Sequence, residues 1–82
     1  MLVSEIIDLR RLVGRNVKST KDFADVPKGS IGRVINHEEN VVMKREEIQV
    51  SWELGLAQKS PIVDWFSRDD KFDETQFLEL VN

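Results

Sequence analysis

Cysteine is missing from this sequence of 82 residues, and histidine occurs only once. The absence of cysteine excludes disulfides, thiolate metal sites and cysteine nucleophiles. The single histidine, His37, precedes two glutamates, but Val41 stands where a metalloprotease motif needs its second histidine. We therefore expect no metal site and no cofactor, and we expect His37 to be an exposed residue of a hairpin.

Long apolar runs are missing as well. No window approaches the roughly 18 consecutive apolar residues of a membrane-spanning helix, and residues 1–7 lack the basic start of a signal peptide. We expect a soluble, cytoplasmic chain without a membrane partner. A chain of 82 residues is also short, since a domain of this size buries only about 60–65% of its unfolded surface. We expect one domain over residues 1–82, comprising a helix at 1–14 and a β-domain at 15–82.

Charge is unevenly distributed along the chain. Residues 1–33 hold seven Lys and Arg against four acids, whereas residues 34–82 hold five against eleven, for a formal net charge of -3. The overall charge argues against a dedicated nucleic-acid binder, although a local basic face would be enough for binding.

The first residues have helical spacing. Ser4 can cap a helix, and Gly14 is placed to end it. The apolar positions of this expected helix are Ile6, Leu9, Leu12 and Val13. A helix of roughly ten residues is too short to be stable alone in water. It must dock either on its own domain or on a partner subunit, and both alternatives are open.

Short β-branched segments fill the rest of the chain. The clearest is residues 48–54, in which apolar and polar residues alternate strictly. Pro27 and Gly29 predict a type II turn before the next strand, in which Gly32 predicts a bulge or bend. Residues 37–40 are expected to interrupt that strand, and residues 69–74 to form a helical or 3₁₀ turn. The expected strands are residues 15–20, 31–35, 48–54, 62–66 and 77–81, with a brief extension at 41–43.

The succession of residues 13–17 (VGRNV), 27–35 (PKGSIGRVI), 48–52 (IQVSW) and 77–81 (FLELV) resembles the SH3-like small barrels of bacterial proteins. It is similar in plan to KOW-type domains, to the small photosystem I subunit with an SH3-like barrel, and to the barrel domains of nitrile hydratase β subunits and of the ferredoxin-thioredoxin reductase variable chain. The resemblance covers roughly residues 13–81 and implies no shared chemistry. The expected fold class is mainly β, a five-stranded SH3-like small barrel with a short N-terminal α-helix.

Two adjacent aromatic residues are the most informative feature for function. Trp65 and Phe66 must face opposite sides of their strand, so one ring leaves the core and can anchor a partner. Asp64, beside them, is expected to point to solvent. No nucleophile and general base can be assembled from this sequence, so we expect no enzyme activity.

Three functions are consistent with these features. The first is a non-catalytic binding module that docks on another protein or on itself, as a homodimer, through the helix and through Trp65 or Phe66. The second is a nucleic-acid-binding module. The third is an auxiliary subunit of an enzyme whose catalytic residues lie on another chain. The residues expected to carry the second function are Arg15, Lys18, Lys28 and Arg33.

Overall fold

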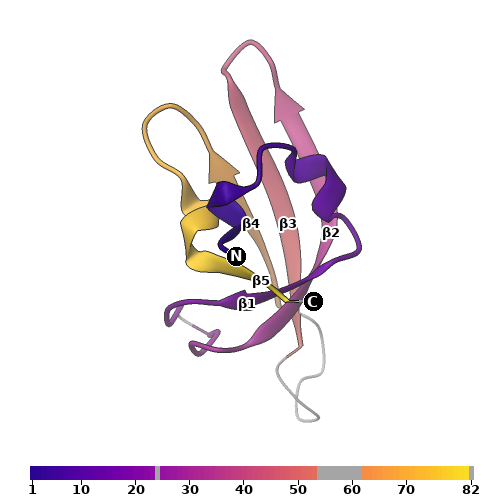
Figure 1. Cartoon of the computed structure of the whole chain (residues 1–82), viewed down its shortest axis with the longest axis vertical. Helices are drawn as coiled ribbons and strands as arrows, with labels where there is room; N and C mark the ends of the chain where they lie inside the picture. Colours follow the sequence, from indigo (N-terminus) through magenta and orange to yellow (C-terminus); the bar gives the residue numbers. More distant parts are fainter. Residues whose placement is uncertain (24, 54–61, 82) are drawn as a thin grey trace.

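Five antiparallel strands form one sheet in the order β4-β3-β2-β1-β5 (Figure 1). The computed structural model describes residues 1–23, 25–53 and 62–81. The mainly β prediction is confirmed. The closed barrel is not, because β4 and β5, at the two ends of the strand order, do not pair within the described residues. The strands are β1 Asn16–Ser19, β2 Ile31–Asn40, β3 Arg45–Glu53, β4 Ile62–Arg68 and β5 Leu78–Val81, and the 3₁₀ turns are η1 Val3–Glu5, η2 Leu9–Leu12 and η3 Glu74–Phe77.

One face of the sheet, here called the inner face, carries the core. The alternation predicted for the third strand is confirmed, since Ile48, Val50 and Trp52 are all buried on this face. Residue 54, the last of that predicted strand, lies outside the described residues. Val17 of β1 and Phe66 of β4 add to the same core, because cross-strand partners project to the same side.

The N-terminal segment covers the inner face but is not an α-helix. Two 3₁₀ turns replace the predicted helix, with Ile6 extended between them at φ -90° and ψ 125°. The buried side chains are Val3, Leu9 and Leu12. Leu9 and Leu12 lie three residues apart within η2, the spacing at which the side chains of a 3₁₀ helix align. Gly14 ends the segment as predicted, at φ +91°.

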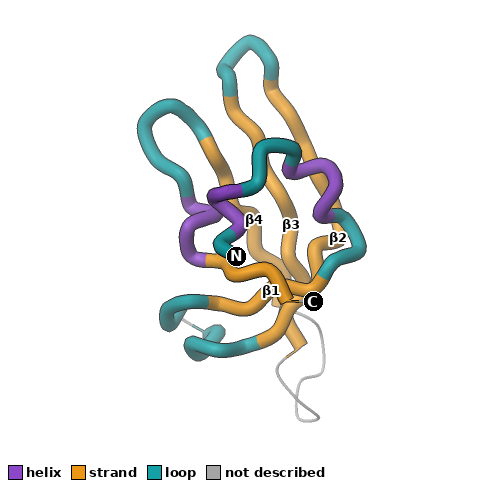
Figure 2. The backbone as a smooth tube through the Cα atoms, in the orientation of Figure 1, coloured by secondary structure: helices purple, strands orange, loops and turns teal. Residues whose placement is uncertain are grey.

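This segment docks on its own chain. Figure 2 shows it crossing in front of the sheet, and Val3, Leu9 and Leu12 belong to the same core cluster as the strand residues. Between the two docking alternatives, the structure therefore places these apolar side chains in their own domain. No helix among the described residues has the length and apolar character to cross a membrane.

The β2–β3 hairpin is longer than predicted. Residues 37–40 were expected to interrupt the strand, yet they pair with β3 throughout, as in Asn40 opposite Arg45. Residues 41–43, expected to be a strand extension, form the exposed turn with Lys44 at φ 51°. Residues 37–40 are polar and form strands poorly by themselves, so their pairing with β3 decides their conformation.

The predicted bulge lies elsewhere. Gly29 has φ +89°, and the amide of Ser30 donates to the carbonyl of Pro27, which confirms the predicted turn. Gly32, in contrast, pairs regularly with Trp52, and the register shift falls between Val34 and Asn36. A glycine within a strand can also mark a place where other atoms approach the backbone closely. Gly32 is such a place, because the side chains of Val50 and Trp52 leave no room for a Cβ atom.

Candidate functional site

Trp65 and Phe66 separate onto the two faces of β4. Phe66 is 4% exposed and lies opposite Ile48 on the inner face, where its ring packs edge-on against Phe23 with centroids 5.5 Å apart. Trp65 is 38% exposed and lies on the opposite, outer face. Of the two predicted anchors, Trp65 is therefore the one available to a partner.

The nearest cross-strand and same-strand neighbours of Trp65 on the outer face are uncharged. Its cross-strand partner is Gln49, and Val63, two residues before it, lies opposite Ser51. Val63 is 39% exposed. On the next strand, β2, Arg33 lies opposite Ser51. We call this set, with Trp65 and Val63 at its centre, the Trp65 surface. Charged residues on neighbouring positions of the same outer face surround it; these are Lys18, Glu38, Glu47 and Glu53.

The four predicted basic residues do not gather in one place. Lys18 and Arg33 project from the outer face of adjacent strands. The Nζ atom of Lys18 lies 4.0 Å from Oε1 of Glu79. Arg15 precedes β1, and Lys28 lies in the turn at 27–30, where its backbone amide donates to Asp22. Glu79 and Asp22 lie beside two of these cations. The positive potential that a phosphate backbone would need is therefore reduced.

His37 was predicted to be exposed, and this is wrong. Its side chain is only 8% exposed, and its Nε2 atom lies 2.8 Å from Oε2 of Glu46. The bulge after Val34 shifts the alternation of β2 by one residue, so His37 lies opposite Ile48 on the inner face. The residue pattern alone contains no signal for this shift, since the bulge depends on how β2 pairs with β3.

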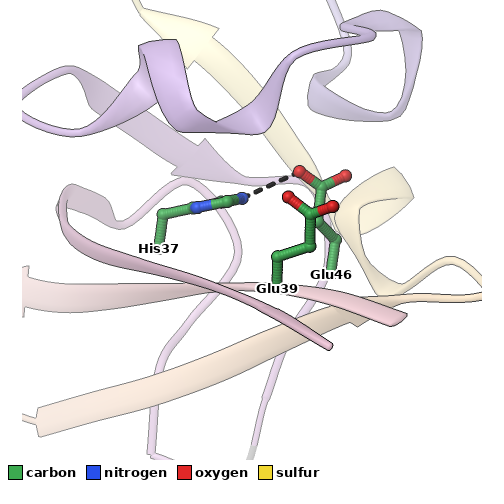
Figure 3. A group of neighbouring side chains, drawn as sticks. All are labelled: His37, Glu39 and Glu46. Atoms are coloured by element: carbon green, nitrogen blue, oxygen red, sulfur yellow. Dashed lines mark hydrogen bonds and ion pairs between the residues drawn. The ribbon is translucent and has the colours of Figure 1, made fainter. Parts of the chain in front are cut away.

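Two glutamates join His37 at this end of the inner face. Glu39 lies directly opposite Glu46 in the β2–β3 ladder. One ligand atom from each of the three side chains falls within 4.8 Å of the others. Figure 3 shows the His37 ring and both carboxylates pointing toward one another. The described structure thus brings together three potential metal ligands, two from β2 and one from β3.

Basic groups flank this cluster on two sides. Arg10 of η2 places Nη2 3.4 Å from Oε2 of Glu39, and the Arg10 side chain is 71% exposed. Arg68 lies opposite Glu46 on β4. Its Nη1 atom donates to the carbonyl of Ile6 at 2.8 Å, which ties β4 to the N-terminal segment. Nη1 of Arg68 is therefore held by Ile6, while its Nε and Nη2 atoms are buried without a hydrogen-bond partner among the described residues. Arg10 contacts Glu39 directly at the exposed surface.

A surface cleft of about 340 Å³ reaches the cluster. Glu39 and Glu46 form part of its wall, and Asp69 and Asp70 line it as well. Hydrogen bonds from the amides of Phe72 and Lys71 hold the pKa of Asp69 below its ordinary value of 3.8. An ion or small polar molecule can reach the two glutamates through this cleft.

Asp64 was expected to point to solvent, but it lies on the inner face opposite Val50. Its Oδ2 atom accepts a hydrogen bond of 3.1 Å from the indole N–H of Trp52. A carboxylate on an apolar face needs such a partner. The indole nitrogen supplies it, which gives the inward position of Asp64 a structural explanation.

Comparisons with protein-family models, curated proteins and solved structures give no match to this chain. The two candidate regions, the Trp65 surface and the His37 cluster, lie on opposite faces of the same sheet. Their chemistry also differs, since the first is centred on the apolar side chains of Trp65 and Val63 and the second on ionisable groups.

Proposed function

We propose that this chain is a non-catalytic binding module of SH3-like plan, and that it associates with a second copy of itself through the Trp65 surface. The strand order and the 3₁₀ turn that leads into β5 support the SH3-like plan, with the sheet open between β4 and β5. The observation that carries the binding role is the exposure of Trp65 on the outer face while Phe66 fills the core.

The composition of the Trp65 surface supports a protein interface. Interface centres are depleted of charge and enriched in aromatic residues and arginine, and their rims are polar. Here Trp65, Val63 and Arg33 are surrounded by uncharged Gln49 and Ser51, and acids lie outside them. An exposed tryptophan in such a position is a typical energetic anchor.

Charge complementarity favours a second copy as the occupant. Glu38 and Arg33 lie on β2 on either side of Asn36, all on the outer face. A two-fold axis that runs across the strands through Trp65 and Asn36 places Glu38 of one copy over Arg33 of the other, and the reverse. The same operation brings the two Trp65 rings together, so one surface supplies both sides of a symmetric interface.

Face-to-face packing is favoured over pairing of β4 edges. The outward-pointing amide of Ser67 already donates to Oε1 of Glu74, at 3.0 Å. Asp64 places an inward-facing charge on the same edge strand. Both features protect a sheet edge from strand addition. The exposed side chains of Trp65 and Val63 are consequently better placed to contact a partner sheet than a partner strand.

Sedimentation velocity over a wide concentration range tests this proposal. We expect a monomer–dimer equilibrium that Trp65→Ser shifts toward monomer, while Phe72→Ser, a matched change at another exposed ring, leaves it unchanged. Arg33→Glu and Glu38→Arg should each weaken the dimer, and the double variant should restore it. A chain that stays monomeric at the highest concentration, or a dimer insensitive to Trp65→Ser, would overturn the proposal.

A further inference from the structure

We propose that His37, Glu39 and Glu46 form a binding site for one divalent transition-metal ion, with Zn²⁺ as the ion that fits the ligands best. The site is independent of the dimer proposed above, because its side chains lie on the inner face. It rests on the donor atoms, on the repulsion between two opposed carboxylates and on the cleft that reaches them.

The donor atoms are close to the spacing that one ion requires. Zn²⁺ binds imidazole nitrogen and carboxylate oxygen at about 2.0–2.2 Å, so two ligands of a tetrahedral ion lie about 3.3 Å apart. Nε2 of His37 and Oε2 of Glu46 are 2.8 Å apart, and all three ligand atoms are within 4.8 Å of one another. A small rotation of Glu39, whose side chain is 44% exposed, closes the remaining distance.

Electrostatics supply a second argument. Glu39 and Glu46 are direct cross-strand partners, and like charges in that position destabilise a sheet. Arg10 compensates Glu39 only through an exposed contact, which contributes little in water. A divalent ion between the carboxylates would remove the repulsion and replace Arg10. Binding would therefore stabilise the β2–β3 hairpin.

The ligand types select among cations. Ca²⁺ and Mg²⁺ prefer sets made only of oxygen, whereas imidazole suits first-row transition metals. One imidazole and two carboxylates therefore favour Zn²⁺. Mn²⁺ is compatible with the same ligands, but we expect it to bind more weakly. Three protein ligands leave one position of a tetrahedral ion open, and the cleft lined by Glu39 and Glu46 provides access to it.

The single histidine makes the site directly observable. A chain without an affinity tag has one imidazole, so its ¹⁵N resonances report on His37 alone. We expect isothermal titration calorimetry to show one Zn²⁺ per chain, together with a large shift of the Nε2 resonance. We expect no such shift with Ca²⁺ or Mg²⁺. Affinity should fall at acid pH, because protons compete with the metal for imidazole and carboxylate.

Paired variants separate the site from general surface charge. His37→Gln and Glu39→Gln should each lower Zn²⁺ affinity by about tenfold or more. Glu47→Gln removes the same charge from the residue next to Glu46, on the opposite face, and should leave affinity unchanged. Glu39 is exposed, so its variant tests the proposal even if His37→Gln does not fold.

Two results would overturn the site. One is the absence of stoichiometric Zn²⁺ binding to the folded wild-type chain. The other is equal binding by wild type, His37→Gln and Glu39→Gln, since this would assign the ion to other surface carboxylates. Monomeric Trp65→Ser should bind Zn²⁺ like the wild type, so failure of the dimer and failure of the metal site remain distinguishable.

Discussion

The indole ring of Trp52 lies so close to Gly32, its direct cross-strand partner, that a Cβ atom at Gly32 would be 2.7 Å from Cε3 of that ring. The same Cβ would be 2.6 Å from Cγ1 of Val50. Both neighbours are fully buried, so neither can move away without disturbing the core. Gly32 is thus required for packing, whereas Gly29 is favoured by its positive φ.

Substitution of Gly32 should therefore be among the most damaging changes in the chain. We expect Gly32→Ala to lower the free energy of unfolding by about 1–3 kcal/mol through overpacking. Gly32→Val adds two further carbons at the same place and should unfold the domain. Urea denaturation measures both, with Lys28→Ala as the control, which should stay within about 0.5 kcal/mol of wild type. A stable Gly32→Val would contradict this account of the core.

The hydrogen bond between Trp52 and Asp64 should contribute measurably to stability. Removing the acceptor with Asp64→Ala leaves the indole N–H without its partner, and we expect a loss of about 1–3 kcal/mol. A double-mutant cycle with Trp52→Phe isolates the bond from the packing of the ring. If the two substitutions prove additive, the contact has no energetic significance.

Asp73 should act as the N-cap of η3. Its side chain accepts from the amide of Thr75 at 2.9 Å and also from the hydroxyl of that fully buried residue. We expect Asp73→Ala to cost about 1 kcal/mol and Asp73→Asn to cost less, because asparagine also caps helices. Thermal unfolding followed by circular dichroism compares the two. If both variants lower stability equally, the loss comes from the missing negative charge and not from the cap. The contact between Oδ2 of Asp73 and Nε of Arg68, at 3.9 Å, would then be the interaction that was lost.

Acid should loosen the turn at residues 69–72. The amide of Phe72 and then that of Lys71 lower the pKa of Asp69 below 3.8 by donating to its carboxylate. A carboxyl whose pKa is lowered by folding stabilises the native state above its unfolded pKa. That contribution disappears as the pH falls through the folded value.

An NMR titration checks that folding lowers the pKa of Asp69. The carboxyl carbon of Asp69 should titrate with a midpoint below 3.8, and the amide signals of Lys71 and Phe72 should move with the same midpoint. In Asp69→Ala those two amide signals should lose this transition. A midpoint at or above the ordinary value would show that the amides do not bind the carboxylate in solution.

Much of the strand pattern was predictable because it depends on local periodicity. The alternation of Ile48, Val50 and Trp52 indicates a strand with one buried face whatever it pairs with. The turn at Pro27 and Gly29 follows from the φ preferences of those two residues. The N-terminal segment was mispredicted because apolar residues three apart suit both an α-helix and successive 3₁₀ turns.

The candidate sites depended on pairing between strands, which a local pattern does not contain. Trp65 is the exposed ring because Phe66 lies opposite Ile48. The side chain of His37 lies on the inner face because the bulge after Val34 turns it inward. A shift of one residue moves every later side chain to the other face, and only the partner strand determines it.

The sequence by itself determined that the chain has no thiol chemistry, one imidazole, mainly β-structure and one core face, since these follow from residue types and their spacing. Tertiary structure decided which aromatic ring is exposed, where the N-terminal segment docks and which charges meet. Glu39 and Glu46 face each other only because β2 and β3 pair in one register. Long-range register, rather than local preference, therefore creates both the Trp65 surface and the His37 cluster.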